Sequence, residues 1–427
     1  MDAKLLAIPL IVSMLAGVSA DRVRSTDTTL VGFGTRNDFS ETASTATTGI
    51  FGARDWIVGQ FEAIAATSGG RMSVRTDDYV QQKTARTPRD VTESSVVATL
   101  AGDEPGRTYI MSSHYDDCDG DCTDGTGVAP GADDNASGVT AVLEAARVMA
   151  PHHFKGTILF VCFDGEELGL WGSAHLADEL KAKDEPVLAM LNDDVIGNST
   201  GGNGVHEPNA IRVFSEGLPA GVDAKASNLY GSENDSPSRE LARFIGDTVP
   251  AYVPNFTLRQ IYRADRNLRG GDQQSFQADG FAAIRFVEPH ENFIHQHQNV
   301  RVENGISYGD LPQYVDFGYI ARATRVNVAA LATLALAPAP PAKANLLLKG
   351  LGYDAKLRWS PSVGATAYEI VWRATDASMW QHAKNVGDVT EATLPVSNDD
   401  YIFGVRALDG AGLRSPATYA LPARERS

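Results

Sequence analysis

The chain has 427 residues, of which 43% are hydrophobic and 21% are charged, a composition that describes a folded protein too long for one ordinary domain. Its formal net charge of −17 argues against nucleic acid as a partner and against attraction to anionic membranes. The surplus of carboxylates is compatible with cation binding.

The first predicted element is a secretory signal peptide at residues 1–20. An apolar run over 5–18 follows a basic residue, and Val18-Ser19-Ala20 has the small side chains of a cleavage site. The run is shorter than the roughly 20 residues of a membrane span. We therefore expect a secreted or periplasmic protein that starts near Asp21 and has no transmembrane segment.

Strand-like and helix-like segments alternate after this leader. We expect helices over 54–66, 138–150 and 173–183 and from 314 to 336, and strands over 95–100, 109–113, 156–163, 187–191 and 281–287. Such alternation predicts an α/β domain over 21–337, with a mixed, mostly parallel central sheet flanked by helices. Ligands of such sheets bind along the carboxyl ends of the strands.

The strand over 156–163 leads into the most informative segment, which reads FVCFDGEELGLWG over 160–172. In extended chain, Glu166 and Glu167 would point to opposite sides, so that one carboxylate could bind a metal while the other transfers protons. A second interpretation is that the two glutamates open a surface helix, where the helix dipole favours acids.

Other polar residues also stand at the ends of predicted elements. They are His114 and Asp116 after one strand, Asp133-Asp134 before a helix, Asp193-Asp194 after another strand, and the histidines of the 290–297 loop. A set of imidazoles and carboxylates without thiolates suits zinc. Five such ligands are too many for one catalytic ion and suit two ions that share a bridging carboxylate.

Four motifs, HYD, GADDNASG, DGEELGLWGS and LNDDVIGN, occur in this order. They resemble the co-catalytic di-zinc aminopeptidases, the family of bacterial leucyl aminopeptidase and aminopeptidase Y, over roughly residues 30–336. The resemblance implies a zinc exopeptidase fold, two zinc ions per chain and peptides with a free N-terminus as substrates.

The resemblance also implies a role for each candidate residue. His114 and Asp194 would hold one zinc, Asp134 would bridge, and Glu167 with a late histidine would hold the second. Glu166 would be the general base and Asp116 would orient His114. A cis peptide is expected between Asp134 and Asn135.

The late histidine is the ambiguous ligand, because the chain reads NFIHQHQN where the family has a histidine followed shortly by aspartate. His295 with Asn299 preserves that spacing, so His295 is preferred to His297 and His290. Register within the motifs likewise selects Asp134 over its neighbour Asp133.

Several alternatives remain open at this stage. Related enzymes include carboxypeptidases and glutaminyl cyclases, and the arginines at 259, 263, 266 and 269 could recognise a substrate carboxylate or form a solvated face. The sequence from Gly197 to Gly201 fits the G-x-S-x-G serine-hydrolase pattern, but no helix pattern follows it.

Three cysteines are present. Cys118 and Cys122 are expected to form a small disulfide ring after export, and Cys162 to be a buried thiol. The acidic loop around the two cysteines faintly resembles a calcium loop, which leaves bound Ca²⁺ or a solvated loop as alternatives.

A Pro/Ala linker over 338–344 precedes a predicted all-β module over 345–427. Its pattern resembles a fibronectin type III domain, with Tyr401 as the tyrosine corner. Trp372 and Trp380 are candidates for binding a surface or polymer. A surface-binding module is thus the non-enzymatic alternative for this part of the chain.

Overall fold

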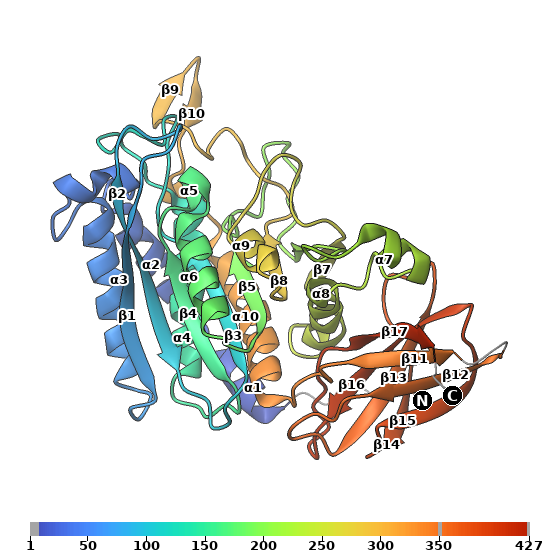
Figure 1. The fold of residues 1–427 in the computed structure, drawn as a ribbon. Coiled ribbons are helices and arrows are strands. Elements are labelled where there is room, and N and C mark those ends of the chain that lie inside the picture. Colours follow the sequence, from blue (N-terminus) through green and yellow to red (C-terminus); the bar gives the residue numbers. More distant parts are fainter. Residues whose placement is uncertain (1–7, 349–351, 425–427) are drawn as a thin grey trace.

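The computed structural model describes residues 8–348 and 352–424, which form an α/β domain followed by a smaller β domain (Figure 1). The α/β domain is built on a sheet of eight strands in the order β1-β2-β4-β3-β5-β8-β6-β7. The strands are β1 (Met72–Gln81), β2 (Val91–Leu100), β3 (Thr108–His114), β4 (Thr157–Phe163), β5 (Val187–Asp193), β6 (Ala210–Ser215), β7 (Thr257–Ile261) and β8 (Ala283–Val287).

The four central strands, β4, β3, β5 and β8, run parallel to one another, whereas β2 and β6 pair antiparallel with them on either side. These central strands are buried on both faces, as is typical of parallel strands in α/β proteins. Because they are parallel, their carboxyl ends lie at one edge of the sheet. The predicted mixed, mostly parallel sheet flanked by helices is confirmed.

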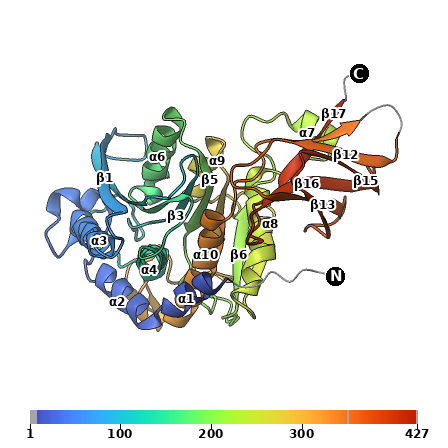
Figure 2. The ribbon, with the colours of Figure 1, turned by 90° about the horizontal axis from the view of Figure 1, so that it is seen from below.

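Helices cover both faces of this sheet, as Figure 2 shows. One face packs against α3 (Gly49–Ala65), α4 (Ser137–Met149), α8 (Pro237–Thr248) and α10 (Phe317–Leu336), and α1 (Pro9–Gly17) and α2 (Ala20–Val31) pack on α4 and α10. The other packs against α6 (Trp171–Ala182) and α9 (Gln273–Ala278). The remaining helices are α5 (Glu166–Gly169) and α7 (Ala224–Tyr230), and a short hairpin is formed by β9 (Arg301–Glu303) and β10 (Ile306–Tyr308). Short irregular turns include η1 (Asp38–Ala43) and η2 (Ala132–Ala136).

The apolar run interpreted as a signal peptide forms part of this helical layer from residue 9 onward. Ile11 is fully buried and Met14 is 2% exposed, and Arg325 of α10 donates to the carbonyls of Leu15 and Val18. The expected cleavage after Ala20 stays a prediction, but it would remove a helix that packs on α4 and α10. In the part of the chain that is described, no helix has both the length and the hydropathy that a bilayer crossing requires.

The C-terminal domain has seven strands: β11 (Ala344–Leu348), β12 (Asp354–Trp359), β13 (Ala367–Ala374), β14 (His382–Gly387), β15 (Glu391–Ser397), β16 (Tyr401–Leu408) and β17 (Thr418–Arg424). β17 pairs with both β16 and β11, which joins the β14-β13-β16 part to the β11-β12-β15 part. One apolar cluster, including Trp359, Ile370 and Phe403, fills the space between them. A separate C-terminal β domain is thus confirmed, while its assignment as fibronectin type III remains a proposal.

Buried charges connect the two domains. Arg373 of β13 lies 2.7 Å from the carboxylate of Asp235, which also pairs with Arg243 of α8 at 2.8 Å. The Trp380 indole N–H donates to Glu240 of α8 at 2.8 Å. Trp380, one of the two tryptophans suggested for polymer binding, therefore contacts the α/β domain.

Candidate active site

Three of the predicted residues meet where β3 and β5 end. His114 is the last residue of β3, Asp194 directly follows β5, and Asp134 lies in η2 before α4. His114 Nε2 is 3.3 Å from Asp134 Oδ1 and 3.7 Å from Asp194 Oδ1, and all three side chains are buried. Residues 80 positions apart in the sequence are thus brought together by strand order alone.

The paired glutamates lie in the first turn of the four-residue helix α5, so the expectation of extended chain at this point is wrong. Gly165 reverses the chain after β4 with φ of 70°, a left-handed conformation that glycine adopts without a steric penalty. In this turn, ligand atoms of Glu166, Glu167 and His114 lie within 4.8 Å of one another. Both glutamates consequently face the same cluster.

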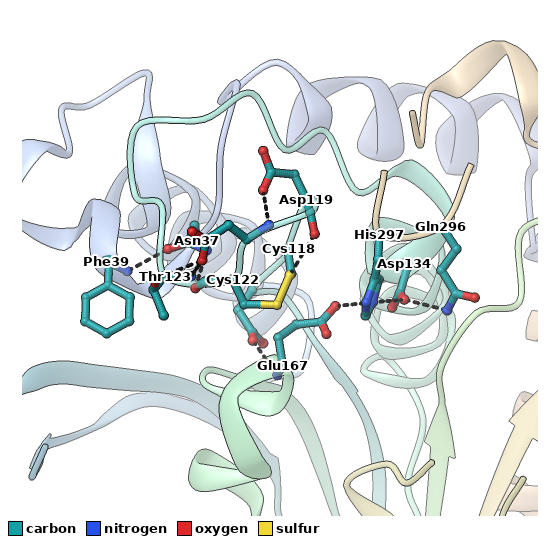
Figure 3. The surroundings of a disulfide bond; sticks show 12 residues. Asn37, Phe39, Cys118, Asp119, Cys122, Thr123, Asp134, Glu167, Gln296 and His297 are labelled. Atoms are coloured by element: carbon teal, nitrogen blue, oxygen red, sulfur yellow. Dashed lines mark hydrogen bonds and ion pairs between the residues drawn. A yellow bond between two sulfur atoms is a disulfide. The ribbon is translucent and has the colours of Figure 1, made fainter. Parts of the chain in front are cut away.

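His297 completes the cluster, and His295 does not. His297 Nε2 lies 2.9 Å from Asp134 Oδ2 and 2.9 Å from Glu167 Oε1 (Figure 3). The His295 ring instead stacks on Tyr314, with 3.7 Å between ring centroids. The preference for His295, based on its distance from Asn299, is corrected by this geometry. The loop turns through a positive φ of 52° at His297, which the sequence spacing does not reveal.

Hydrogen-bond partners distinguish the two members of each Asp-Asp pair. Asp133 accepts a hydrogen bond from Gly197 N at 2.7 Å, and Asp193 accepts one from Asn327 of α10 at 2.8 Å. Asp133 and Asp193 therefore bind groups of the surrounding fold, and Asp134 and Asp194 are the members of each pair that face His114. The expected cis peptide between Asp134 and Asn135 is present.

Asp116 lies behind His114. Its carboxylate is 3.3 Å from His114 Nδ1, and its main-chain oxygen is 3.1 Å from the same nitrogen. Asp116 Oδ2 also accepts from the Glu167 amide at 3.0 Å. The position therefore suits a residue that orients both the imidazole and the α5 turn.

The disulfide of Cys118 and Cys122 is present in the adjoining loop, and Figure 3 shows it beside Glu167. Cys162 is buried in β4, and burial raises the pKa of its thiol. The acidic loop binds its own backbone: Asp121 accepts from Thr123 N and Asp124 from Thr126 N. These contacts support the interpretation of a solvated loop rather than a calcium loop.

Sequence reasoning missed three residues that contact the cluster. Arg285 of β8 lies 2.7 Å from Asp194 Oδ1 and is 1% exposed. Gln296 donates to Asp134 Oδ2 at 2.7 Å, and Asp310 accepts from the main-chain amides of residues 133 and 134. Arg285 lies inside the predicted strand over 281–287, and this position gave no signal that its side chain contacts the cluster.

The cluster forms the floor of an open cavity of about 480 Å³. Arg86, Arg266, Leu268 and Arg269 line its walls. Arg266 and Arg269 both pair with Glu291 at 2.7 Å, so part of the predicted arginine group is neutralised. Arg259 pairs with Glu207 and does not line the cavity.

Electrostatics favour proton transfer and cation binding at this floor. Burial raises the pKa of the Glu166 carboxyl well above its ordinary value, which suits a proton acceptor and donor. The charge of Glu167 raises the pKa of His297. Glu167 Oε1 is buried and lies 2.9 Å from His297 Nε2, so both atoms can hold the same cation.

The serine-hydrolase alternative lacks its geometry. Ser199 lies in a loop that pairs back on residue 206, and its hydroxyl donates to Asp316 at 2.8 Å. His206 Nδ1 is 3.5 Å from that hydroxyl, and the next described helix, α7, begins only at Ala224. The strand–turn–helix of a nucleophile elbow is therefore missing at this motif.

Comparison with known proteins shows which family the chain is similar to. The profile of peptidase family M28 matches residues 95–304. A probable zinc metalloprotease of Leptosphaeria maculans is 45% identical over 417 residues, which is 96% of each chain. Among solved structures, the LapA aminopeptidase of Legionella pneumophila is similar in fold, with a TM-score of 0.56, 20% identity and 78% coverage of both chains. A glutaminyl cyclase of Porphyromonas gingivalis has a TM-score of 0.50 and 16% identity over 74% of this chain and 98% of its own.

Proposed function

Because the chain belongs to peptidase family M28 and is a zinc metallopeptidase, we propose that it is an aminopeptidase that removes N-terminal residues from peptides with two zinc ions. The observation that carries this proposal is the position of Asp134. Its two carboxylate oxygens lie 3.3 Å from His114 and 2.9 Å from His297, so one residue can bridge two ions.

The residues fit such a pair of ions. His114, Asp134 and Asp194 would hold one zinc, and Asp134, Glu167 and His297 would hold the other. Each set is made of nitrogen and oxygen ligands, with room for substrate at the open cavity. Cys118 is near Glu167 but is bonded to Cys122 and offers no thiolate.

Zinc, when bound, supplies Lewis-acid chemistry that acidifies water and polarises a carbonyl. Glu166 does not belong to either ligand set and lies at the cavity floor. It takes the proton of the attacking water and returns it to the leaving amine. Asp116 keeps the His114 imidazole in place through Nδ1.

The test combines Glu166→Gln with metal analysis. The variant keeps the shape of the side chain and both ligand sets, so we expect close to two zinc ions per chain and a loss of turnover of at least about 100-fold. The wild-type enzyme should cleave a leucine arylamide and not its N-acetylated form. Normal turnover by the zinc-loaded variant, or equal cleavage of the blocked substrate, would contradict the proposal.

Carboxypeptidase activity is a second candidate, because Arg86 and Arg269 line the cavity and could bind a terminal carboxylate. Hydrolysis of an N-blocked peptide with a free C-terminus would favour it. Cyclisation of an N-terminal glutamine, the reaction named for the structural neighbour of Porphyromonas gingivalis, is the third arm of the same assay.

We place the enzyme outside the cytoplasm as part of this proposal. The Cys118–Cys122 disulfide supports export, since such bonds persist in oxidising compartments. We propose the C-terminal domain as a fibronectin type III-like unit that is fixed to the peptidase domain. Binding of a surface or polymer remains the alternative role, for which Trp372 is the remaining candidate.

A further inference from the structure

A second group of acidic residues lies beneath the active site, on the far side of the β4–α5 turn. It consists of Asp38 in η1, Glu93 in β2 and Asp164 directly after β4. Ligand oxygens of the three carboxylates lie within 4.8 Å of one another. Their residues are 1%, 0% and 1% exposed, so water does not solvate them.

The hydrogen bonding of this group is incomplete. Ser94 N and the Tyr115 hydroxyl donate to Asp164 Oδ2, at 2.8 and 3.2 Å. The other oxygen of Asp164 and both oxygens of Asp38 and Glu93 are buried and have no donor. Burying five carboxylate oxygens without a donor strongly destabilises the folded state, unless a bound cation or bound protons neutralise their charge.

No side-chain cation of the described residues compensates the group. Arg89, the nearest in sequence to Glu93, pairs with Glu41, and Arg54 pairs with Asp55. Within residues 8–348 and 352–424, no lysine, arginine or histidine forms an ion pair with any of the three carboxylates.

A further oxygen faces the group from the neighbouring strand. Tyr79 of β1 is the direct cross-strand partner of Glu93, and its hydroxyl is also buried without a hydrogen-bond partner. Burial, and then the charges of Glu93, Asp164 and Asp38, raise the pKa of Tyr79. As a direct cross-strand partner, Tyr79 projects from the same face of the sheet as Glu93. Tyr79 does not belong to the acidic group, and its unpartnered oxygen is an independent sign of a missing ligand.

We propose that Asp38, Glu93, Asp164 and Tyr79 form a structural calcium site, separate from the zinc site. One oxygen of each carboxylate lies within 4.8 Å of the others, and Ca²⁺ takes oxygen ligands, with carboxylates binding through one or both oxygens. Zinc prefers nitrogen or sulfur ligands, and Mg²⁺ keeps several waters that this buried group does not accommodate.

The position of the site suggests what calcium would do. Asp164 immediately precedes Gly165, and a β-carbon added at Gly165 would stand 2.6 Å from Glu93 Oε2. The turn that carries Glu166 and Glu167 therefore packs directly against Glu93, one of the proposed calcium ligands. A bound ion would fix this turn against η1 and β2 and so stabilise the folded enzyme.

The test uses full-length, zinc-saturated protein freed of calcium, with equilibrium dialysis against ⁴⁵Ca²⁺ and thermal unfolding. We expect one calcium per chain and a rise in Tm of several degrees in the wild type. Glu93→Gln and, separately, Asp38→Asn should weaken binding at least about 100-fold and abolish the rise. The matched control is Asp121→Asn with Asp124→Asn, which changes the exposed acidic loop and should bind calcium like the wild type.

Three outcomes would overturn the proposal: no calcium bound by the wild type at millimolar concentration, unchanged binding by both triad variants, or loss of binding in the loop control. A group held by protons instead of calcium would leave Tm independent of calcium. The free energy of unfolding of the wild type would then fall as pH rises, because the three buried carboxyls lose the protons that they share. The same fall would be absent in Glu93→Gln. That result also counts against the site. None of these measurements depends on peptidase activity.

Discussion

Asp235→Asn should uncouple the two domains, because Asp235 is the anion shared by two buried arginines. Its carboxylate lies 2.8 Å from Arg243 of the peptidase domain and 2.7 Å from Arg373 of the C-terminal domain. The side chains of Asp235, Arg243 and Arg373 are 0%, 1% and 3% exposed. The substitution keeps the volume of the side chain and removes the charge.

The expected cost follows from this geometry. A pair of unit charges about 4 Å apart attracts by about 4 kcal/mol at an effective dielectric constant near 20, and two such pairs share this anion. Relaxation and water entry recover part of the loss, so we expect about 3–5 kcal/mol, the usual cost of breaking a buried ion pair. Glu240 stays as a partner of Arg243, which makes the lower half of that range the better expectation.

Calorimetry and urea denaturation check this value. A loss of this size should lower the midpoint of the transition that includes the interface by roughly 6–20 °C. The matched control is Asp279→Asn, which removes the same charge from a pair with the half-exposed Lys181 and should cost at most about 1 kcal/mol. If Asp235→Asn loses no more stability than Asp279→Asn, the buried network does not join the domains, and the C-terminal domain is a loosely attached spacer.

The remaining predictions concern single elements. His297→Ala should lose one of two zinc ions and at least about 100-fold in kcat/KM, while His295→Ala should keep both ions; the reverse result would restore His295 as the ligand. Removal of residues 338–427 should leave hydrolysis of a small arylamide intact, since the residues that line the cavity belong to the peptidase domain. The truncation should lower Tm, because it exposes Asp235 and Glu240. Complete inactivity of a folded truncation would refute this prediction. Burial raises the pKa of Glu240 to about 7, so its contribution to the free energy of unfolding should be lost as pH rises from about 4.5 through 7. Urea denaturation at several pH values should show this loss in the wild type and a smaller one in Glu240→Gln. N-terminal sequencing of the exported enzyme should find a start near Asp21, as the predicted leader requires. A start before residue 9 would show instead that the helix with the buried Ile11 and Met14 is retained.

The fold class and the centre of the sheet could be predicted from the chain itself, whereas β1, β6, β7 and α8 were not expected. Runs of apolar residues gave the central strands, and 3.6-residue periodicity gave α4, α6 and α10, each within a few residues of its observed bounds. The strand ends then placed His114, Glu166, Glu167 and Asp194 at one edge of the sheet, and Asp134 was placed just before a helix. Alternating strands and helices leave few other arrangements, because a helical crossover returns the chain to the same edge of the sheet, which makes the joined strands parallel and aligns their carboxyl ends.

Only the tertiary structure decided between neighbouring candidates. His295 and His297 are two residues apart in one loop, and the direction of each imidazole depends on Tyr314 and Asp134, which lie far away in the sequence. The same holds for Arg285, whose charge meets Asp194 across adjacent strands. The periodicity of apolar residues predicts the secondary structure of a segment and the face that it buries. Which side chains then meet depends on loops and packing between distant segments, for which a single sequence carries no local signal.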